Sequence, residues 1–166
     1  MATPTNLPAA QTTGNVLTAA YMNDLRGAFR ILQVVQGSTA TLVSNSTTTM
    51  ADTNLTATIT PQSSSSKILV MVSQSFSKSD GNTLNAVASR IMRGATNIMT
   101  FQGASLYTGT TLIIVGSHAS AIVLDSPATT SATTYKTQFA NFTAAASVSA
   151  NPNSALATIT LFEVSA

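Results

Sequence analysis

The chain has 166 residues, of which 7% are charged and 44% hydrophobic, with a formal net charge of +2 and no cysteine. This length allows one domain with a substantial core and a short appendage. Charged residues make up about 25% of an average soluble domain, so a free monomer of this chain would have little charge repulsion to keep it dispersed. Subunit contacts are the simplest way to cover part of such a surface. The scattered basic residues disfavour nucleic-acid binding, and the lack of cysteine excludes disulfides and thiolate metal sites.

The first 30 residues are expected to form an N-terminal arm followed by a short helix. Residues 1–15 contain prolines and a glycine among small polar residues, which favours an extended segment. No signal peptide is evident, and no apolar run approaches the roughly 18 residues of a membrane helix, so we expect no membrane insertion. Apolar residues three or four apart then predict a helix that begins at Thr18: Leu17, Tyr21, Leu25, Phe29 and Leu32. A helix this short needs a docking surface, either its own β domain or a neighbouring chain.

Residues 55–76 are the clearest strand pair of the β domain expected over residues 31–166. Residues 55–60 alternate apolar residues with threonine, which predicts a strand with one buried face. Pro61 ends that strand and a run of serines forms a turn. The next strand, residues 68–72, is apolar on both faces and is therefore expected in mid-structure, under a second sheet or against another subunit. Ile68, Val70 and Val72 are its candidate core and subunit-contact residues.

The rest of the chain also consists of short strands separated by turn residues. We expect strands at residues 29–35 and 40–44, divided by Gly37 and Ser38, and at residues 85–93 and 96–101, divided by Gly94 and Ala95. Residues 103–109 are expected to be a loop, followed by strands at residues 111–115, 119–124, 135–142 and 157–164. Eight or nine strands with regular turn signals predict an all-β antiparallel fold, a jelly roll or a related two-sheet sandwich.

No pattern in the sequence predicts a catalytic, cofactor-binding or metal-binding residue. His118 is the only histidine, and a catalytic triad would need a carboxylate such as Asp125 and a serine in an exposed elbow, but no G-x-S-x-G occurs. A surface or interface histidine is favoured instead. The few aromatic residues that could bind carbohydrate, Phe101, Tyr107 and Tyr135, are better explained by core or turn packing. A glycosidase with paired carboxylates stays open as an alternative, although nothing in their spacing favours it.

Residues 54–73, NLTATITPQSSSSKILVMVS, resemble a segment of small bacteriophage virion proteins, in which a string of the form D-t-x-L-t-a-x-I-T-P-x-S-x-x-S-K-I-L-V opens the β domain. Later segments are similar to that group in the same order: Arg93-Gly94, Asp125-Ser126-Pro127, Thr133-Thr134-Tyr135 and the last strand at residues 157–164. Residues 14–20 and Met22-Asn23 also resemble a short anchoring segment of phage fibre proteins.

The resemblance implies a trimeric virion fibre, spike or decoration protein of a bacteriophage. It implies a homotrimer, bound to other virion proteins of the tail or capsid through Leu17, Tyr21, Leu25 and Phe29. The distal loops would then contact a host surface glycan or protein, or the protein would decorate or cement the capsid. The protein is accordingly expected in the virion after synthesis in the host cytoplasm, and to be no enzyme.

Overall fold

The computed structural model describes residues 13–14, 16, 18–19, 22, 31–79, 84–109, 111–143 and 146–165. The predicted helix residues Leu17, Tyr21, Leu25 and Phe29 lie outside these residues. Leu32, the last residue of the same predicted stripe, lies in a strand instead of a helix. Within the described part of the N-terminal segment, the Met22 N–H donates to the Thr18 carbonyl oxygen at 3.0 Å, as in one turn of an α-helix.

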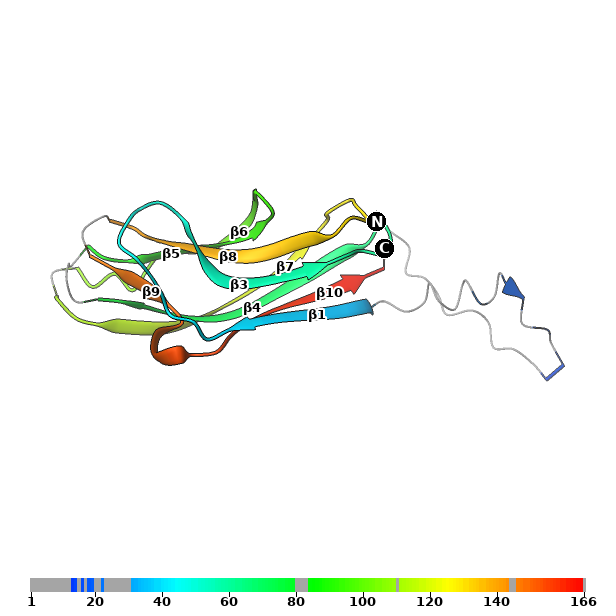
Figure 1. Ribbon diagram of the computed structural model, residues 1–166, viewed down its shortest axis with the longest axis horizontal. Helices are drawn as coiled ribbons and strands as arrows, with labels where there is room; N and C mark the ends of the chain where they lie inside the picture. The colour runs from blue at the N-terminus through cyan, green and yellow to red at the C-terminus, as the bar shows by residue number, and fades with distance from the viewer. Residues whose placement is uncertain are drawn as a thin grey trace.

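The fold is an antiparallel β-sandwich, as the sequence predicts. Two sheets lie one over the other, with β3, β5, β6 and β8 in one layer and β1, β4, β9 and β10 in the other (Figure 1). The strands are β1 (Ile31–Thr39), β2 (Val43–Asn45), β3 (Ala51–Ile59), β4 (Lys67–Lys78), β5 (Val87–Arg93), β6 (Thr96–Ser105), β7 (Val115–Asp125), β8 (Thr133–Asn141), β9 (Val148–Ala150) and β10 (Ala157–Val164). A single 3₁₀ turn, η1 (Pro152–Ser154), separates β9 from β10.

The six-stranded sheet is built around β4, its longest strand. One edge of β4 pairs with β7 along its whole length, and the other edge pairs first with β10 and then with β9. β1 pairs with β10, and β2 with β9. The four-stranded sheet has the order β3-β8-β5-β6. The predicted central place of residues 68–72 is therefore confirmed, and the serine turn before them carries the chain from one sheet to the other.

The core lies between the two sheets. Ile68, Val70 and Val72 point into it from β4, opposite Leu55 and Ile59 of β3. The intervening residues of β4 point to the other side of the sheet, because side chains alternate along a strand. The prediction that both sides of this strand are apolar is therefore explained by one side that faces the core and another that faces outward.

A polar chain of buried side chains also crosses the core. Thr53 and Thr137 share a hydrogen bond at 2.5 Å, and the Thr137 hydroxyl donates to Gln74 Oε1 at 2.9 Å. Gln74 Nε2 then donates to Asn151 Oδ1 at 3.0 Å, and Asn151 Nδ2 donates to the Thr41 carbonyl oxygen at 2.9 Å. All four side chains are buried and bonded, so the chain fixes the two sheets relative to each other at no cost in unpaired polar groups.

The predicted break at Gly37 and Ser38 is wrong, because β1 continues through both residues. A Cβ on Gly37 would lie 1.9 Å from the Thr56 carbonyl oxygen of β3. Glycine is needed here for the close approach of two strands from opposite sheets, which is a known use of glycine inside strands.

Two further boundaries differ from the prediction. β6 runs to Ser105, into the segment expected to be a loop, and residues 111–114 precede β7 instead of forming a strand. Leu112, Ile113 and Ile114 are exposed, although all three are apolar and the two isoleucines are β-branched, which suits a buried strand.

Candidate interaction surface

The outer side of the six-stranded sheet is apolar along its central strands. Leu69 and Met71 of β4 point away from the core. The register places Leu69 beside Leu124 of β7 and Phe162 of β10, and Met71 beside Ile122 of β7. Phe162 in turn lies beside Val34 of β1. We call these six side chains the apolar face: Val34, Leu69, Met71, Ile122, Leu124 and Phe162.

The apolar face is open to solvent in the single chain. Val34, Ile122 and Leu124 are 55%, 59% and 58% exposed, and Met71 is 38% exposed. A sheet with one free side normally places polar residues there. Contiguous apolar side chains in that position indicate a surface that another molecule covers.

Charge is nearly absent from this side of the sheet. Among the residues of β1, β4, β7 and β10, the charged side chain that points outward is Lys67 at the start of β4, whose Nζ donates to Ser126 Oγ at 2.7 Å. Lys78 and Glu163 are buried, and Asp125 binds Arg93 of the opposite sheet.

The outer side of the four-stranded sheet has the opposite character. Asp52 accepts hydrogen bonds from Lys136 Nζ at 2.8 Å and from Gln138 Nε2 at 2.7 Å. Gln138 Oε1 accepts two more from Arg90, at 2.8 and 3.0 Å. Partial burial raises the pKa of Asp52, but the bonds from Lys136 and Gln138 outweigh it and hold that pKa below its ordinary value. This polar face is suited to water.

A hollow of about 300 Å³ lies in the apolar face. Its apolar walls are Met71 and Ile122, and the remaining outward-facing walls are the hydroxyl side chains of Ser73, Ser120, Thr158 and Thr160. It contains no charged side chain, so it would accept an apolar or hydroxyl-bearing side chain of a partner.

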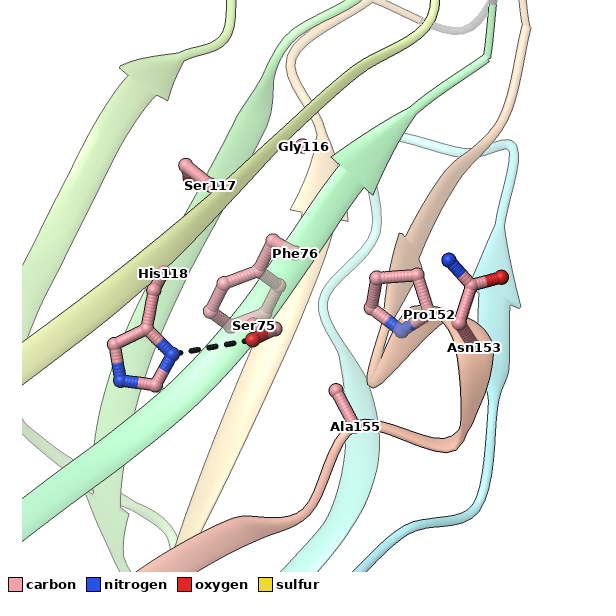
Figure 2. A pocket seen from close by; sticks show the side chains of 8 residues that line it. All are labelled: Ser75, Phe76, Gly116, Ser117, His118, Pro152, Asn153 and Ala155. Atoms are coloured by element: carbon pink, nitrogen blue, oxygen red, sulfur yellow. Dashed lines mark hydrogen bonds between the residues drawn. The ribbon is translucent and has the colours of Figure 1, made fainter.

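His118 lies on the same side of the sheet, farther along β4 and β7. Its ring nitrogens bind two serines of β4, Nε2 to Ser73 Oγ at 2.8 Å and Nδ1 to Ser75 Oγ at 3.1 Å. The ring lines a hollow of about 420 Å³, together with Pro152 and Asn153 of η1. Figure 2 shows these side chains, with the hydrogen bond between His118 and Ser75 as a dashed line. No carboxylate of the described residues binds the ring, so the orienting group that a triad requires is missing from that part of the chain.

The three carboxylates of the described residues lie apart and are occupied in separate contacts. Besides Asp52, Asp125 binds Arg93 Nη1 with both oxygens at 2.8 Å and accepts the Tyr135 hydroxyl at 2.7 Å. Glu163 accepts Gln33 Nε2 at 2.6 Å and the Gln62 N–H at 2.7 Å. Burial raises the pKa of Glu163, but these bonds outweigh it and keep that pKa below its usual range.

Burial and the bond to Asp125 raise the pKa of Tyr135. No three histidine or acidic residues of the described chain gather where they could hold a metal ion. Within the same residues, no helix has the length and hydrophobicity to cross a membrane.

Three of the segments behind the phage resemblance meet at one end of the sandwich. Arg93 binds Asp125 and, at 3.1 Å, the Ser126 carbonyl oxygen. The Gly94 N–H donates to the Thr134 carbonyl oxygen at 2.9 Å. These segments, far apart in sequence, therefore join β5, β7 and β8 around one ion pair.

The sequence-predicted residues divide between core and surface. Ile68, Val70 and Val72 are buried within the single chain, so any role in a trimer contact would be indirect. Tyr135 is buried and Phe101 packs against the core, as expected, while Tyr107 is exposed.

The sequence analysis missed Ile122 and Leu124. Residues 119–124 are three small residues followed by the large apolar residues Ile122, Val123 and Leu124, and a large residue in a strand is ordinarily assigned to the core. The structure buries Ala121 instead and leaves Ile122 and Leu124 outside. The available signal was the run of three large apolar residues at 122–124, which makes both sides of the strand apolar but does not indicate which side is exposed.

Comparisons with known proteins give no family. No protein-family description matches the sequence, and no curated protein matches it. Solved structures similar to this chain include the VP2 subviral particle of infectious bursal disease virus (TM-score 0.41, 16% identity) and the structure of the Gt strain of that virus (TM-score 0.43, 16% identity). The aligned region covers 82% and 81% of this chain but 38% of each of those chains, so the chain spans less than two fifths of their length.

Proposed function

We propose that this protein is a non-enzymatic structural subunit of a bacteriophage virion and that it works as a homotrimer. The observation that carries the proposal is the contrast between the two outer sides of the sandwich. One side is hydrogen-bonded and charged, whereas the other is apolar and nearly uncharged, as expected for a subunit of a larger assembly. The ordered set of phage-like segments in the sequence supplies the kind of assembly.

The topology supports different roles for the two ends of the sandwich, attachment at one end and outward-facing loops at the other. β1 begins beside the end of β10, where Ile31 pairs with Val164, so the N-terminal segment joins the domain at this end. The ends of β2, β4, β6 and β8 and the starts of β3, β5, β7 and β9 lie at the opposite end. We propose that residues 1–30 attach the protein to the particle and that the opposite loops face outward.

Two positions on the particle are compatible with this arrangement. As a tail or head fibre or spike, the protein would direct its outer loops at a host surface glycan or protein. As a decoration or cement protein, it would lie on capsid faces and stabilise them. The exposed apolar side chains of residues 106–114, among them Tyr107, Leu112 and Ile114, favour the first role, because they offer a partner uncharged contact area.

Electron microscopy of particles labelled on this protein tests the proposal. Gold label on fibres or spikes supports the first role, and label over the faces of the head supports decoration. Particles from which all label is absent would overturn the virion assignment. Incubation of the purified protein with host polysaccharide is the complementary test, since shortened polysaccharide chains would show an enzyme instead.

A further inference from the structure

A homotrimer needs a surface that joins its copies, and the single chain offers two large flat sides. The polar face already satisfies its charges internally, through the bonds among Asp52, Gln138, Lys136 and Arg90. A partner that covered the polar face would remove these groups from water, and the free-energy cost of desolvating charged groups would offset much of the binding energy. The apolar face has no such cost.

We infer that the apolar face packs against a second copy of this chain. The inference rests on the proposed homotrimer and adds the surface that would form it. In a trimer each interface joins different parts of two copies, but residues near the three-fold axis approach their own copies, so like charges there repel. This side of the sheet has one outward charge, Lys67, which lies at the start of β4 and donates a hydrogen bond to Ser126. The side therefore avoids most of that repulsion.

The size of this side also fits a contact between subunits. β4 has 12 residues, which at about 3.3 Å per residue gives a length of about 40 Å. Four strand positions about 4.8 Å apart give a width of about 19 Å, hence roughly 750 Å². A stable interface buries about 800 Å² on each partner. In a closed ring of three, each subunit contacts two neighbours, so this side of the sheet would supply about half of the area that the two contacts bury on one subunit.

The face is shaped for side-chain insertion. The hollow between Met71, Ile122 and the surrounding hydroxyl groups lies within the apolar face. A side chain of the second copy would fill it, with the exposed Leu124 and Val34 beside the contact. Both the knob and the hollow would then come from the same surface.

Lysine substitutions test the inference on the full chain. Ile122→Lys and Leu124→Lys change exposed side chains, so the single subunit should keep its fold, judged by circular dichroism. Thr58→Lys and Thr134→Lys are the matched controls, since both residues are exposed and paired on the polar face. In sedimentation at micromolar concentration, the wild type and the controls should have about three chain masses, and the two variants of the apolar face about one.

A single-cysteine experiment covers the case in which the lysine variants fail to fold. The natural chain has no cysteine, so Ile122→Cys and the control Thr58→Cys each carry one thiol. Reaction of native protein with a maleimide should be at least tenfold slower at position 122 than at position 58, and the rates should become equal in denaturant.

The outcomes separate the inference from the proposed function. A trimeric wild type whose Ile122→Lys and Leu124→Lys variants also remain trimers, or equal native labelling at positions 122 and 58, would overturn the inference and leave the homotrimer in place. A monomeric wild type would overturn the homotrimer and the inference together.

Discussion

At the scale of single residues, Asp125 shows that one of the few charged side chains of this fold connects several strands. It lies at the end of β7 and binds Arg93 of β5 and Tyr135 of β8. Its side chain is 11% exposed, whereas that of Asp52 on the polar face is 47% exposed. Two carboxylates, each paired with one cation, therefore occupy very different surroundings.

Asp125→Ala should lower the free energy of unfolding by about 3 kcal/mol, because it leaves a partly buried guanidinium and a tyrosine hydroxyl without their acceptor. Asp52→Ala, its control, should cost less than about 1 kcal/mol, since exposed ion pairs contribute little. Urea denaturation followed by circular dichroism measures both. Equal losses in the two variants would show that the contacts of Asp125 do not bind the sheets together.

Gly37 is the second residue with a defined role. A Cβ at this position would contact the Thr56 carbonyl oxygen and push β1 away from β3. Gly37→Ala should therefore cost at least about 2 kcal/mol, as overpacking does. Gly116→Ala is the control, because its Cβ would lie 3.7 Å from the nearest atom, the Phe76 carbonyl oxygen. Its stability in the same urea titration should be unchanged or slightly higher, and a similar loss in both variants would contradict the steric explanation.

At the scale of elements, β4 separates folding from assembly within two consecutive residues. Val70 points into the core and Met71 points outward. Val70→Asp should abolish folding, because a buried carboxylate without a partner costs a large part of the 5–15 kcal/mol that stabilises a typical domain. Met71→Asp should keep the β-sheet spectrum and sediment as a monomer. A folded Val70→Asp protein would show that the strand faces the other way.

The elements also show how far the sequence predicts this structure. The last strand is predicted at residues 157–164 and is found at Ala157–Val164. The prediction succeeds because the apolar alternation and the preceding turn residues indicate the same boundaries. The sequence predicts strands at residues 111–115 and 119–124, whereas β7 is one strand from Val115 to Asp125. The pattern also leaves open which side of residues 119–124 is buried, since both sides are apolar. The sequence predicts a turn at Gly37 because the reason for glycine there depends on β3, a strand of the other sheet.

The candidate interaction surface could not be found from the sequence for the same reason. Val34, Leu69, Ile122 and Phe162 come from four strands that are far apart in the chain, and the register of those strands brings them together. The sequence did predict that residues 68–72 would need cover on both sides, and the structure assigns one side to the core and the other to the surface.

At the scale of the whole molecule, the sandwich has two distinct ends. The end at which β1 starts and β10 finishes carries the ion pair of Arg93 and Asp125 and the phage-like segments around it. The opposite end carries exposed apolar side chains in residues 106–114. A molecule with this polarity is suited to being held at one end and presented at the other.

The proposed attachment segment precedes the first of these ends. Residues 1–15 have too few large apolar residues to fold alone, and the stripe of Leu17, Tyr21, Leu25 and Phe29 is too short to keep a helix without a docking surface. The particle would supply the missing contacts. Because the sandwich begins at Ile31, removal of residues 1–15 leaves every strand and the apolar face intact.

Deletion of residues 1–15 should therefore give a folded homotrimer that no longer joins the virion. Circular dichroism and sedimentation check the fold and the trimer, and immunoblotting of purified particles checks incorporation beside the full-length protein. Leu25→Asp should also reduce incorporation, but it could disturb the trimer if the helix docks on its own domain, so the deletion separates attachment from assembly more cleanly. A truncated protein found in particles at the full-length level would place the attachment surface on residues outside 1–15.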